Sequence, residues 1–320
     1  MDQLLYDEIP SLDLNDFKNG TTVDKQKFVA DLGAAYQSIG FVAIKNHGLS
    51  AELSGQLYQV IQAFFSLPDE VKKRYEKPEI FGQRGYISKN KEKAKGFKTA
   101  DLKEFYHIGQ PDDTRLAEYP ANIWPDEIEN FEKLSLEAFR VLQEAGLDML
   151  RAIALYLGLE EHYFDEKARQ GNSILRAIHY FPIDDPDSIP LDAVRAAEHG
   201  DINLITLLMG ASADGLQVLR RDGRWIPITA LPEQIVVNVG DMLSRLTNNK
   251  LKSTIHRVVN PPRDQMGSPR YSIPFFMHPV SSMDLSCLPS CVDEANPKGY
   301  TDILAGEFLD ERLREIGLKS

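Results

Sequence analysis

The pair His199 and Asp201, followed by His256, constrains this chain more than any other feature of its sequence. Residues i and i+2 of a β-strand point to the same face, so the first two side chains can bind one ion while the glycine between them turns away. His256 comes 55 residues after Asp201 (256 − 201) in a β-branched segment, and we expect a strand on the far side of a rolled sheet to bring it to the same ion. Two imidazoles and one carboxylate on one face of an octahedral metal ion leave its other positions open. The motif therefore predicts a metal centre at which chemistry takes place.

A second pair, Arg270 and Ser272, follows the third potential ligand. By the same alternation, the two side chains share one face of the strand expected there. A guanidinium group can donate two parallel hydrogen bonds to a carboxylate, and a neighbouring hydroxyl can add another. This pair predicts a binding site for the carboxylate group of a ligand.

These two motifs, in this order, resemble those of the iron(II)- and 2-oxoglutarate-dependent oxygenases, in particular the isopenicillin N synthase-like branch. Similar segments extend over nearly the whole chain, at 9–13, 40–48, 64–68, 215–218, 225–227, 237–242 and 253–261. The resemblance implies an α+β fold with a double-stranded β-helix, or jelly roll, as its core and with N-terminal and flanking helices. We expect residues 1–320 to form a single oxygenase unit, with a family-like N-terminal region at 1–120 and the jelly-roll catalytic core, which carries the iron site, at 170–280.

The resemblance implies that Fe(II) is bound by His199, Asp201 and His256, with 2-oxoglutarate and O2 as co-substrates. The expected reaction is the hydroxylation of a small molecule with release of succinate and CO2. Two alternatives remain open. A non-haem iron oxidase that does not use 2-oxoglutarate is the first, because an Arg-x-Ser pair grips the substrate itself in isopenicillin N synthase. A catalytically silent jelly roll that binds a ligand is the second.

One departure from the family's pattern affects the co-substrate site. Plant relatives carry a tyrosine that helps to hold 2-oxoglutarate where this chain has Phe181, and phenylalanine cannot donate that hydrogen bond. His179 shares the face of Phe181 on the expected strand, so we expect it to assist Arg270 and Ser272 in binding 2-oxoglutarate. The residues expected to line the substrate pocket are Arg84, Tyr86, Phe105, His107 and Phe181.

Composition limits the partners of the chain. Its 320 residues, 42% of them hydrophobic, are enough for one large core. A formal net charge of −12 argues against a nucleic-acid-binding surface, which would be basic. No stretch approaches 18 apolar residues and the N-terminus lacks a signal-peptide pattern, so we expect a cytoplasmic protein that binds a small molecule and no membrane. The two cysteines are expected to be free thiols in that compartment, and the oligomeric state does not follow from the sequence.

Hydrophobic periodicity predicts helices mainly in the N-terminal half and strands mainly after it. Helices are expected over 22–38, 50–65, from 68 onwards, 125–157 with a break or bend near Gly146, and 305–316, and strands over 41–45, 103–109, 174–181, 202–208, 215–219, 235–239, 253–259 and 270–278. Residues 89–98 form a basic island in this acidic chain. A solvated loop is the ordinary interpretation of such a segment, and a mobile lid that attracts an anionic substrate is the alternative.

Overall fold

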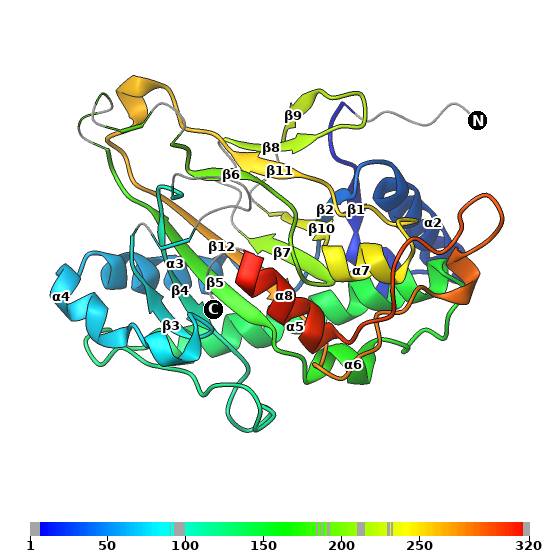
Figure 1. Cartoon of the computed structure of the whole chain (residues 1–320), viewed down its shortest axis with the longest axis horizontal. Helices are drawn as coiled ribbons and strands as arrows, with labels where there is room; N and C mark the ends of the chain where they lie inside the picture. Colours follow the sequence, from blue (N-terminus) through cyan, green and yellow to red (C-terminus); the bar gives the residue numbers. More distant parts are fainter. Residues whose placement is uncertain are drawn as a thin grey trace.

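The computed structural model of the chain describes residues 7–89, 91–92, 100–183, 185, 187, 189–190, 193–209, 215–228, 231 and 233–315. Two β-sheets face each other, and a layer of helices covers the outer face of the larger sheet (Figure 1). The smaller sheet lies on the opposite side, where it carries His199 and His256, two of the three potential metal ligands. The site is therefore built between the sheets and not among the helices.

The larger sheet has eight strands in the order β1-β2-β10-β7-β12-β5-β4-β3, and the smaller has four in the order β6-β11-β8-β9. The strands are β1 Ser11–Asp13, β2 Phe41–Lys45, β3 Gly85–Ile87, β4 Glu104–Ile108, β5 Ile174–Tyr180, β6 Ala196–His199, β7 Ile205–Met209, β8 Leu216–Leu219, β9 Trp225–Pro227, β10 Ile235–Val239, β11 His256–Val258 and β12 Arg270–Met277. Among these strands, β1 and β2 pair in parallel and the other pairs are antiparallel. Because β2 pairs with β10, the N-terminal region belongs to the same sheet as the C-terminal core.

The helices are α1 Leu14–Lys18, α2 Thr22–Ser38, α3 Ala51–Phe65, α4 Asp69–Lys72, α5 Phe131–Tyr156, α6 Asp165–Arg169, α7 Asp241–Leu246 and α8 Ala305–Glu315, with 3-10 turns η1 Lys73–Tyr75, η2 Pro78–Ile80, η3 Arg263–Gln265 and η4 Pro289–Cys291. Side-chain caps fix the start of two long helices. Thr21 and Asp24 form a reciprocal capping box at α2. The Ser50 hydroxyl accepts a hydrogen bond of 3.1 Å from the Leu53 N–H at α3. Both starts agree with the sequence expectation.

Two hydrophobic clusters, one on each face of the larger sheet, hold the layers together. The first fills the space between this sheet and helices that include α2, α3 and α5, with Leu142 and Leu207 among its fully buried members. The second lies between the two sheets and joins Ile178 of β5 to Val218 of β8. Strand residues alternate between faces, so a strand such as β5 contributes to both clusters. This alternation later decides which side chains can reach the site.

Most of the expected elements are confirmed, and two are corrected. His199 and Asp201 were expected on one strand, but β6 ends at His199 and Asp201 lies in the loop that follows. Helix α5 begins at Phe131 and not at residue 125, and it runs unbroken through Gly146, where a break or bend was expected. A Cβ atom at Gly146 would lie 2.5 Å from the sulfur of Met277 and 3.3 Å from Leu207 Cδ1. The glycine therefore serves the close packing of α5 on the larger sheet.

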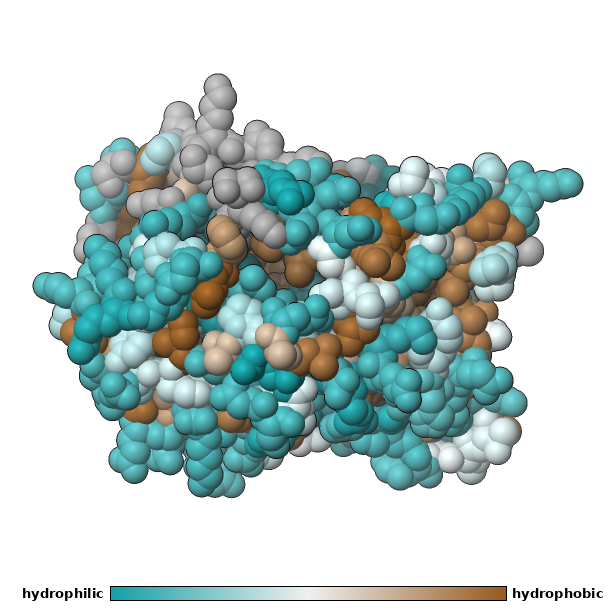
Figure 2. Space-filling view, turned by 60° about the horizontal axis from the view of Figure 1, so that its bottom comes forward, coloured by the Kyte–Doolittle hydropathy of each residue, from teal (hydrophilic) through white to brown (hydrophobic). Residues whose placement is uncertain are grey.

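The surface and the helices give two further observations. The face drawn in Figure 2 is mainly hydrophilic, and apolar residues form separate patches on it. None of the helices in the described ranges combines the length and the apolar character that crossing a bilayer requires.

Candidate metal centre

Two of the three potential metal ligands come from neighbouring strands of the smaller sheet, and the third comes from the loop after one of these strands. β6 ends at His199 and β11 begins at His256, and these residues are direct partners in the antiparallel pairing. Asp201 lies two residues beyond β6, in the loop that leads to β7. The expectation that His256 would come from the far side of a rolled sheet is corrected, because adjacent strands bring the two histidines together.

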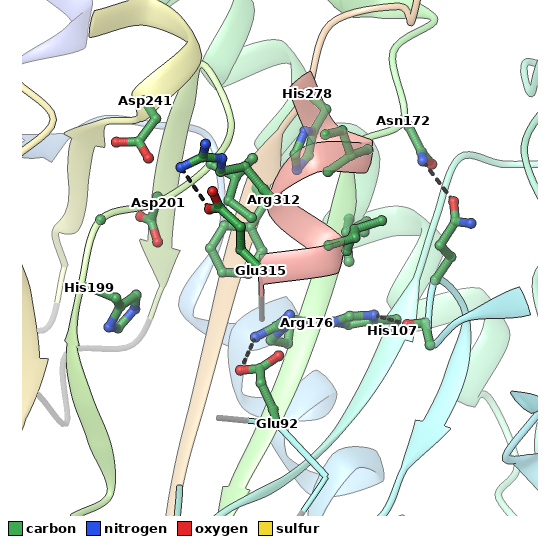
Figure 3. A pocket seen from close by; sticks show the side chains of 18 of the residues that line it. Glu92, His107, Asn172, Arg176, His199, Asp201, Asp241, His278, Arg312 and Glu315 are labelled. Carbon is green, nitrogen blue, oxygen red and sulfur yellow. Dashed lines mark hydrogen bonds and ion pairs between the residues drawn. The ribbon is translucent and has the colours of Figure 1, made fainter. Parts of the chain in front are cut away.

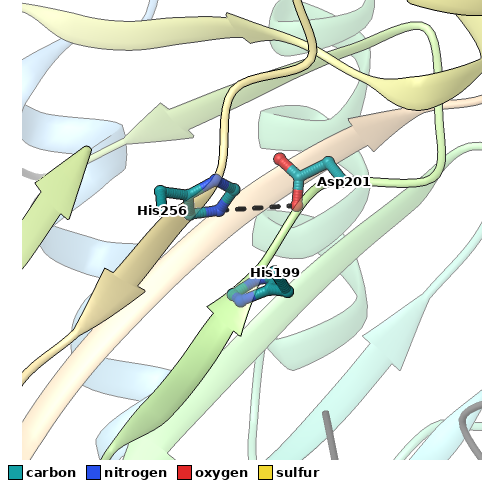
Figure 4. A group of neighbouring side chains, drawn as sticks. All are labelled: His199, Asp201 and His256. Carbon is teal, nitrogen blue, oxygen red and sulfur yellow. Dashed lines mark ion pairs between the residues drawn. The ribbon is translucent and has the colours of Figure 1, made fainter. Parts of the chain in front are cut away.

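The three side chains point toward one another (Figure 4). One possible ligand atom from each lies within 4.8 Å of those of the other two. His256 Nε2 is 3.7 Å from Asp201 Oδ1, and the ring centroids of His199 and His256 are 4.4 Å apart. Atoms that each lie about 2.0–2.2 Å from one ion are at most about 4.4 Å apart, so a small closure of the side chains would place all three on a single metal ion.

Backbone carbonyl groups orient both imidazoles. His199 Nδ1 lies 2.7 Å from the carbonyl oxygen of Ala197, and His256 Nδ1 lies 3.2 Å from that of Thr254. A carbonyl oxygen can only accept, so Nδ1 carries the proton in each ring and donates it. Nε2 of each ring is then the unprotonated atom, which is the form that binds a metal.

Asp201 is oriented in a similar way by two side chains. Its Oδ2 accepts hydrogen bonds from Thr206 Oγ1 at 2.6 Å and from Asn238 Nδ2 at 2.8 Å. These donors come from β7 and β10 of the larger sheet. They leave Oδ1, the oxygen nearer to His256, to face the two imidazoles.

The charge states suit metal binding. Burial and the proximity of His256 lower the pKa of His199 to about 4, so the imidazole is neutral near pH 7. Burial raises the pKa of Asp201, but the two histidines and the hydrogen bonds to its carboxylate outweigh burial and the net pKa is lowered. A neutral imidazole and an ionised carboxylate are the ligand forms of these groups.

Arg270 and Ser272 lie on the face of β12 that looks into the space between the sheets. In the register of the antiparallel strands, Arg270 lies opposite Tyr180 of β5 and Ser272 lies opposite Ile178. Both of these β5 residues belong to the inter-sheet cluster. The Arg270 guanidinium carbon is 4.9 Å from the centre of the Tyr180 ring. Both motif residues are buried, as a carboxylate clamp in a dry site would be.

His179 lies on the opposite face of β5. It stacks on Tyr271 with ring centroids 4.8 Å apart, and its Nδ1 lies 2.8 Å from Glu104 Oε1. Its other neighbour is Phe65 of α3. The alternation of β5 turns His179 toward the helices and Tyr180 toward Arg270, so the structure does not bring His179 to the Arg270–Ser272 pair.

A pocket of about 420 Å³ opens beside His199 and Asp201 (Figure 3). Its floor comes from β5 and β12, its far wall from the segments around residues 81–83 and 107, and a third side from α8. Among the expected substrate contacts, the pocket lining includes His107. Of the basic island at 89–98, only residues 89, 91 and 92 are described, so the lid interpretation lies mostly outside the described residues.

The structure places the other four expected substrate contacts away from the pocket lining. Arg84 is fully buried, donates to Asn172 Oδ1 at 2.8 Å, and packs so closely on Gly109 that a Cβ there would overlap its guanidinium. The Tyr86 hydroxyl donates to Glu104 on the helical side of the sheet. Phe105 is buried in the inter-sheet cluster, and Phe181 packs under Lys89.

Sequence reasoning named His107 but missed the polar group to which it belongs in the pocket lining, with Glu92, Lys103 and Arg176. Arg176 Nε donates to His107 Nε2 at 2.6 Å, and Arg176 Nη1 donates to Glu92 Oε1 at 3.2 Å. Burial and Arg176 hold the pKa of His107 well below its usual value, so this ring is neutral and donates from Nδ1 to the Gly82 carbonyl. A signal was available for Arg176, because an arginine inside an apolar strand is rarely buried unless it is paired.

Comparisons with known proteins agree with this site. Residues 9–127 match the family described as non-haem dioxygenase in morphine synthesis N-terminal, and residues 171–279 match the 2OG-Fe(II) oxygenase superfamily. The crystal structure of a 2OG-Fe(II) oxygenase family protein from Caulobacter crescentus is 44% identical, with a TM-score of 0.85 over 96% of this chain and 99% of that one. The proline hydroxylase buaE of Petromyces alliaceus is 35% identical over 96% of this chain and 98% of its own length.

The chain belongs to the iron(II)- and 2-oxoglutarate-dependent oxygenases. It is of the isopenicillin N synthase-like type, and its α+β fold with a jelly-roll core is confirmed. A further crystal structure, that of a full-length Neurospora crassa protein in complex with alpha-KG and thymine, is 32% identical with a TM-score of 0.85 over 98% of this chain and 97% of that one. The enzyme is thus a non-haem iron dioxygenase whose cofactor is Fe(II) and whose co-substrates are 2-oxoglutarate and O2.

Proposed function

We propose that this oxygenase hydroxylates a small organic molecule and releases succinate and CO2. The observation that carries the proposal is the convergence of His199, Asp201 and His256 beside a pocket of small-molecule size. When they are bound, Fe(II) and 2-oxoglutarate supply the activation of dioxygen and the oxidation of a C–H bond. Relatives of similar identity are a proline hydroxylase and a protein crystallised with thymine, which supports a small-molecule substrate in general.

In this proposal each residue has a defined task. The Nε2 atoms of His199 and His256 and the Oδ1 atom of Asp201 hold Fe(II). Arg270 donates a bidentate pair of hydrogen bonds to the distal carboxylate of 2-oxoglutarate, and Ser272 adds a third. Tyr180, whose ring lies against the Arg270 guanidinium, keeps that guanidinium in place. It is therefore Tyr180, and not His179 as we had expected, that lies beside Arg270.

The proposal also treats residues 1–320 as one oxygenase unit, with 1–120 as its N-terminal region and 170–280 as the catalytic core. Two observations support it. β2 from the N-terminal region pairs with β10, and one hydrophobic cluster contains residues of α2, α3, α5 and the larger sheet.

The first experiment tests the co-substrate in the wild-type protein. Anaerobic titration of the Fe(II)-loaded protein with 2-oxoglutarate should produce a metal-to-ligand absorption band. A metabolite screen scored by succinate release should then find a substrate whose oxidation consumes 2-oxoglutarate in equal amount. Oxidation of a substrate without that band and without succinate would instead favour an oxidase in which Arg270 grips the substrate.

The Arg270→Lys variant tests the carboxylate clamp. Lysine keeps the positive charge but loses the planar fork, so 2-oxoglutarate should bind more weakly while Fe(II) binds as before. The loss of one charge-assisted hydrogen bond corresponds to a rise in the dissociation constant of about 10- to 150-fold. The band titration measures it directly. Arg224→Lys, on an exposed residue, is the matched control, and equal titration curves for Arg270→Lys and this control would contradict the assignment.

A further inference from the structure

Arg176 is held rigidly at the floor of the pocket, on the β5 strand (Figure 3). Two hydrogen bonds, to His107 and to Glu92, fix its orientation within the plane of the guanidinium. Two aromatic rings from the neighbouring strands flank it. Its guanidinium carbon is 4.3 Å from the centre of the Phe105 ring on β4 and 5.1 Å from that of Phe276 on β12.

This arrangement leaves hydrogen-bond donors for a ligand. A guanidinium has five N–H groups, and the two hydrogen bonds found for Arg176 in the described part of the chain use two of them, so three remain (5 − 2). Because aromatic rings flank the group, these donors can be reached only at the edge of the guanidinium plane. An acceptor that approaches in that plane, such as a carbonyl oxygen, fits this geometry.

The described residues that line the pocket away from the metal centre carry no surplus charge. The cationic side chains among them are Lys103, Arg176 and Arg312. Lys103 Nζ lies 2.7 Å from carboxylate oxygens of both Glu92 and Asp101, and Arg312 Nη1 lies 2.9 Å from Glu315 Oε2. On the described sides of the pocket away from the metal centre, three cations and three acids therefore cancel (3 − 3 = 0). The remaining lining acids lie on the metal side and add only negative charge.

An anionic substrate would bring a further negative charge next to Glu92, whose carboxylate already balances Arg176 and Lys103, whereas an uncharged substrate would not. Charges of the same sign repel most strongly where little water screens them. Three more polar atoms of the lining, Glu92 Oε2, His278 Nδ1 and Arg312 Nε, are buried and have no hydrogen-bond partner within the described ranges. The pocket lining thus combines hydrogen-bond donors at Arg176 with other polar atoms that still lack partners.

We infer that the pocket selects an uncharged substrate that carries an amide or imide group, with the carbonyl oxygen bound at the edge of Arg176 and the adjacent N–H facing Glu92. This inference rests on the proposed function only in taking the pocket beside the metal centre as the substrate site. It identifies Arg176 and Glu92 as specificity-determining residues, and it excludes carboxylate substrates of similar shape.

Matched pairs of compounds test the inference on the Fe(II)- and 2-oxoglutarate-loaded protein without oxygen. Nicotinamide is compared with nicotinate, and thymine with 5-methylorotate, by calorimetry and by the change that each causes in the 2-oxoglutarate band. The uncharged member of each pair should bind at least about tenfold more tightly, since a carboxylate would add a second negative charge beside Glu92. Tighter binding of the carboxylates, or no binding of either uncharged compound at millimolar concentration, would overturn the inference.

Two variants locate the selectivity. Glu92→Gln removes one acid from the wall, so the preference for the uncharged member should fall by at least about tenfold. Arg176→Lys should weaken binding of the uncharged member by about 10- to 150-fold. Arg263→Lys, an exposed ion-pair residue, is the matched control and should change neither value.

The readouts separate this inference from the proposed function. Both pocket variants should keep the wild-type 2-oxoglutarate band and a similar unfolding temperature. A wild-type protein with no such band would contradict the proposed function, while ligand selectivity measured by calorimetry would still test the pocket. An unchanged preference in Glu92→Gln, in a protein that still gives the band, would contradict the inference alone.

Discussion

At the scale of single residues, the metal centre depends on groups that do not touch the metal. Asp201 has two oxygens, and the hydrogen bonds from Thr206 and Asn238 both go to Oδ2. The other oxygen is therefore the one presented to His199 and His256. Outer partners of this kind fix the orientation of a ligand, and their loss typically lowers metal affinity by about 10- to 100-fold.

The Thr206→Val variant tests this role, because valine has nearly the same shape and lacks the hydroxyl. We expect Fe(II) affinity to fall by about 10- to 100-fold while the fold is kept, as measured by anaerobic Fe(II) titration. Thr247→Val is the control, since its buried hydroxyl donates to the Leu243 carbonyl in α7 and its loss should reduce stability only. Equal Fe(II) affinity in the two variants would show that the hydroxyl of Thr206 does not orient Asp201.

At the scale of elements, the loop that carries Asp201 is fixed by the start of α7. The Asp201 carbonyl accepts a hydrogen bond of 2.6 Å from the N–H of Asp241, the first residue of α7. The Leu204 carbonyl accepts one of 2.9 Å from the N–H of Gly240, which precedes the helix. The first N–H groups of a helix have no partner inside it. The loop therefore caps α7, and α7 in turn holds the loop and Asp201 in place.

Gly240 makes this contact possible, and Gly240→Ala should disrupt it. A Cβ atom there would lie 2.2 Å from the carbonyl oxygen of Asn203, so backbone must move. Overpacking of this kind costs about 1–3 kcal/mol, and we expect a lower free energy of unfolding in urea together with weaker Fe(II) binding. Gly55→Ala is the opposite control, because this exposed glycine in α3 has open space around its Cα. Alanine should stabilise that helix by about 0.5–1 kcal/mol, and a Gly240→Ala protein with wild-type stability and Fe(II) affinity would contradict the argument.

At the scale of the whole molecule, the sequence predicted what depends on local pattern and missed what depends on distant contacts. The caps at Thr21 and Ser50 and the apolar run of β10 lie within a few residues of the elements that they define, so these bounds were predicted correctly. The β6 strand has little β-branched character, and pairing with β11 makes it a strand. The same holds for the pocket, because no local signal shows that α8 folds back beside β5 and β12.

A buried neutral histidine should also make the stability of the folded protein fall in acid. Burial, with Arg84 and Arg176 nearby, lowers the pKa of His278 to about 4 despite the opposing effect of Asp201. In the unfolded chain its pKa is about 6.5. As pH falls from about 6.5 to about 4, the unfolded state therefore binds a proton that the folded state does not, and stability decreases.

The His278→Gln variant isolates this contribution in the metal-free protein. One histidine with such a shift accounts for roughly 3 kcal/mol of stability lost across that window, so the variant should lose less free energy of unfolding than wild type between pH 6.5 and pH 4. Urea unfolding at a series of pH values measures the slope. His162→Gln, on an exposed histidine, is the control and should follow the wild-type slope. If His278→Gln does the same, His278 is already protonated in the folded protein or stays accessible to protons, and the pocket wall is more hydrated than its burial indicates.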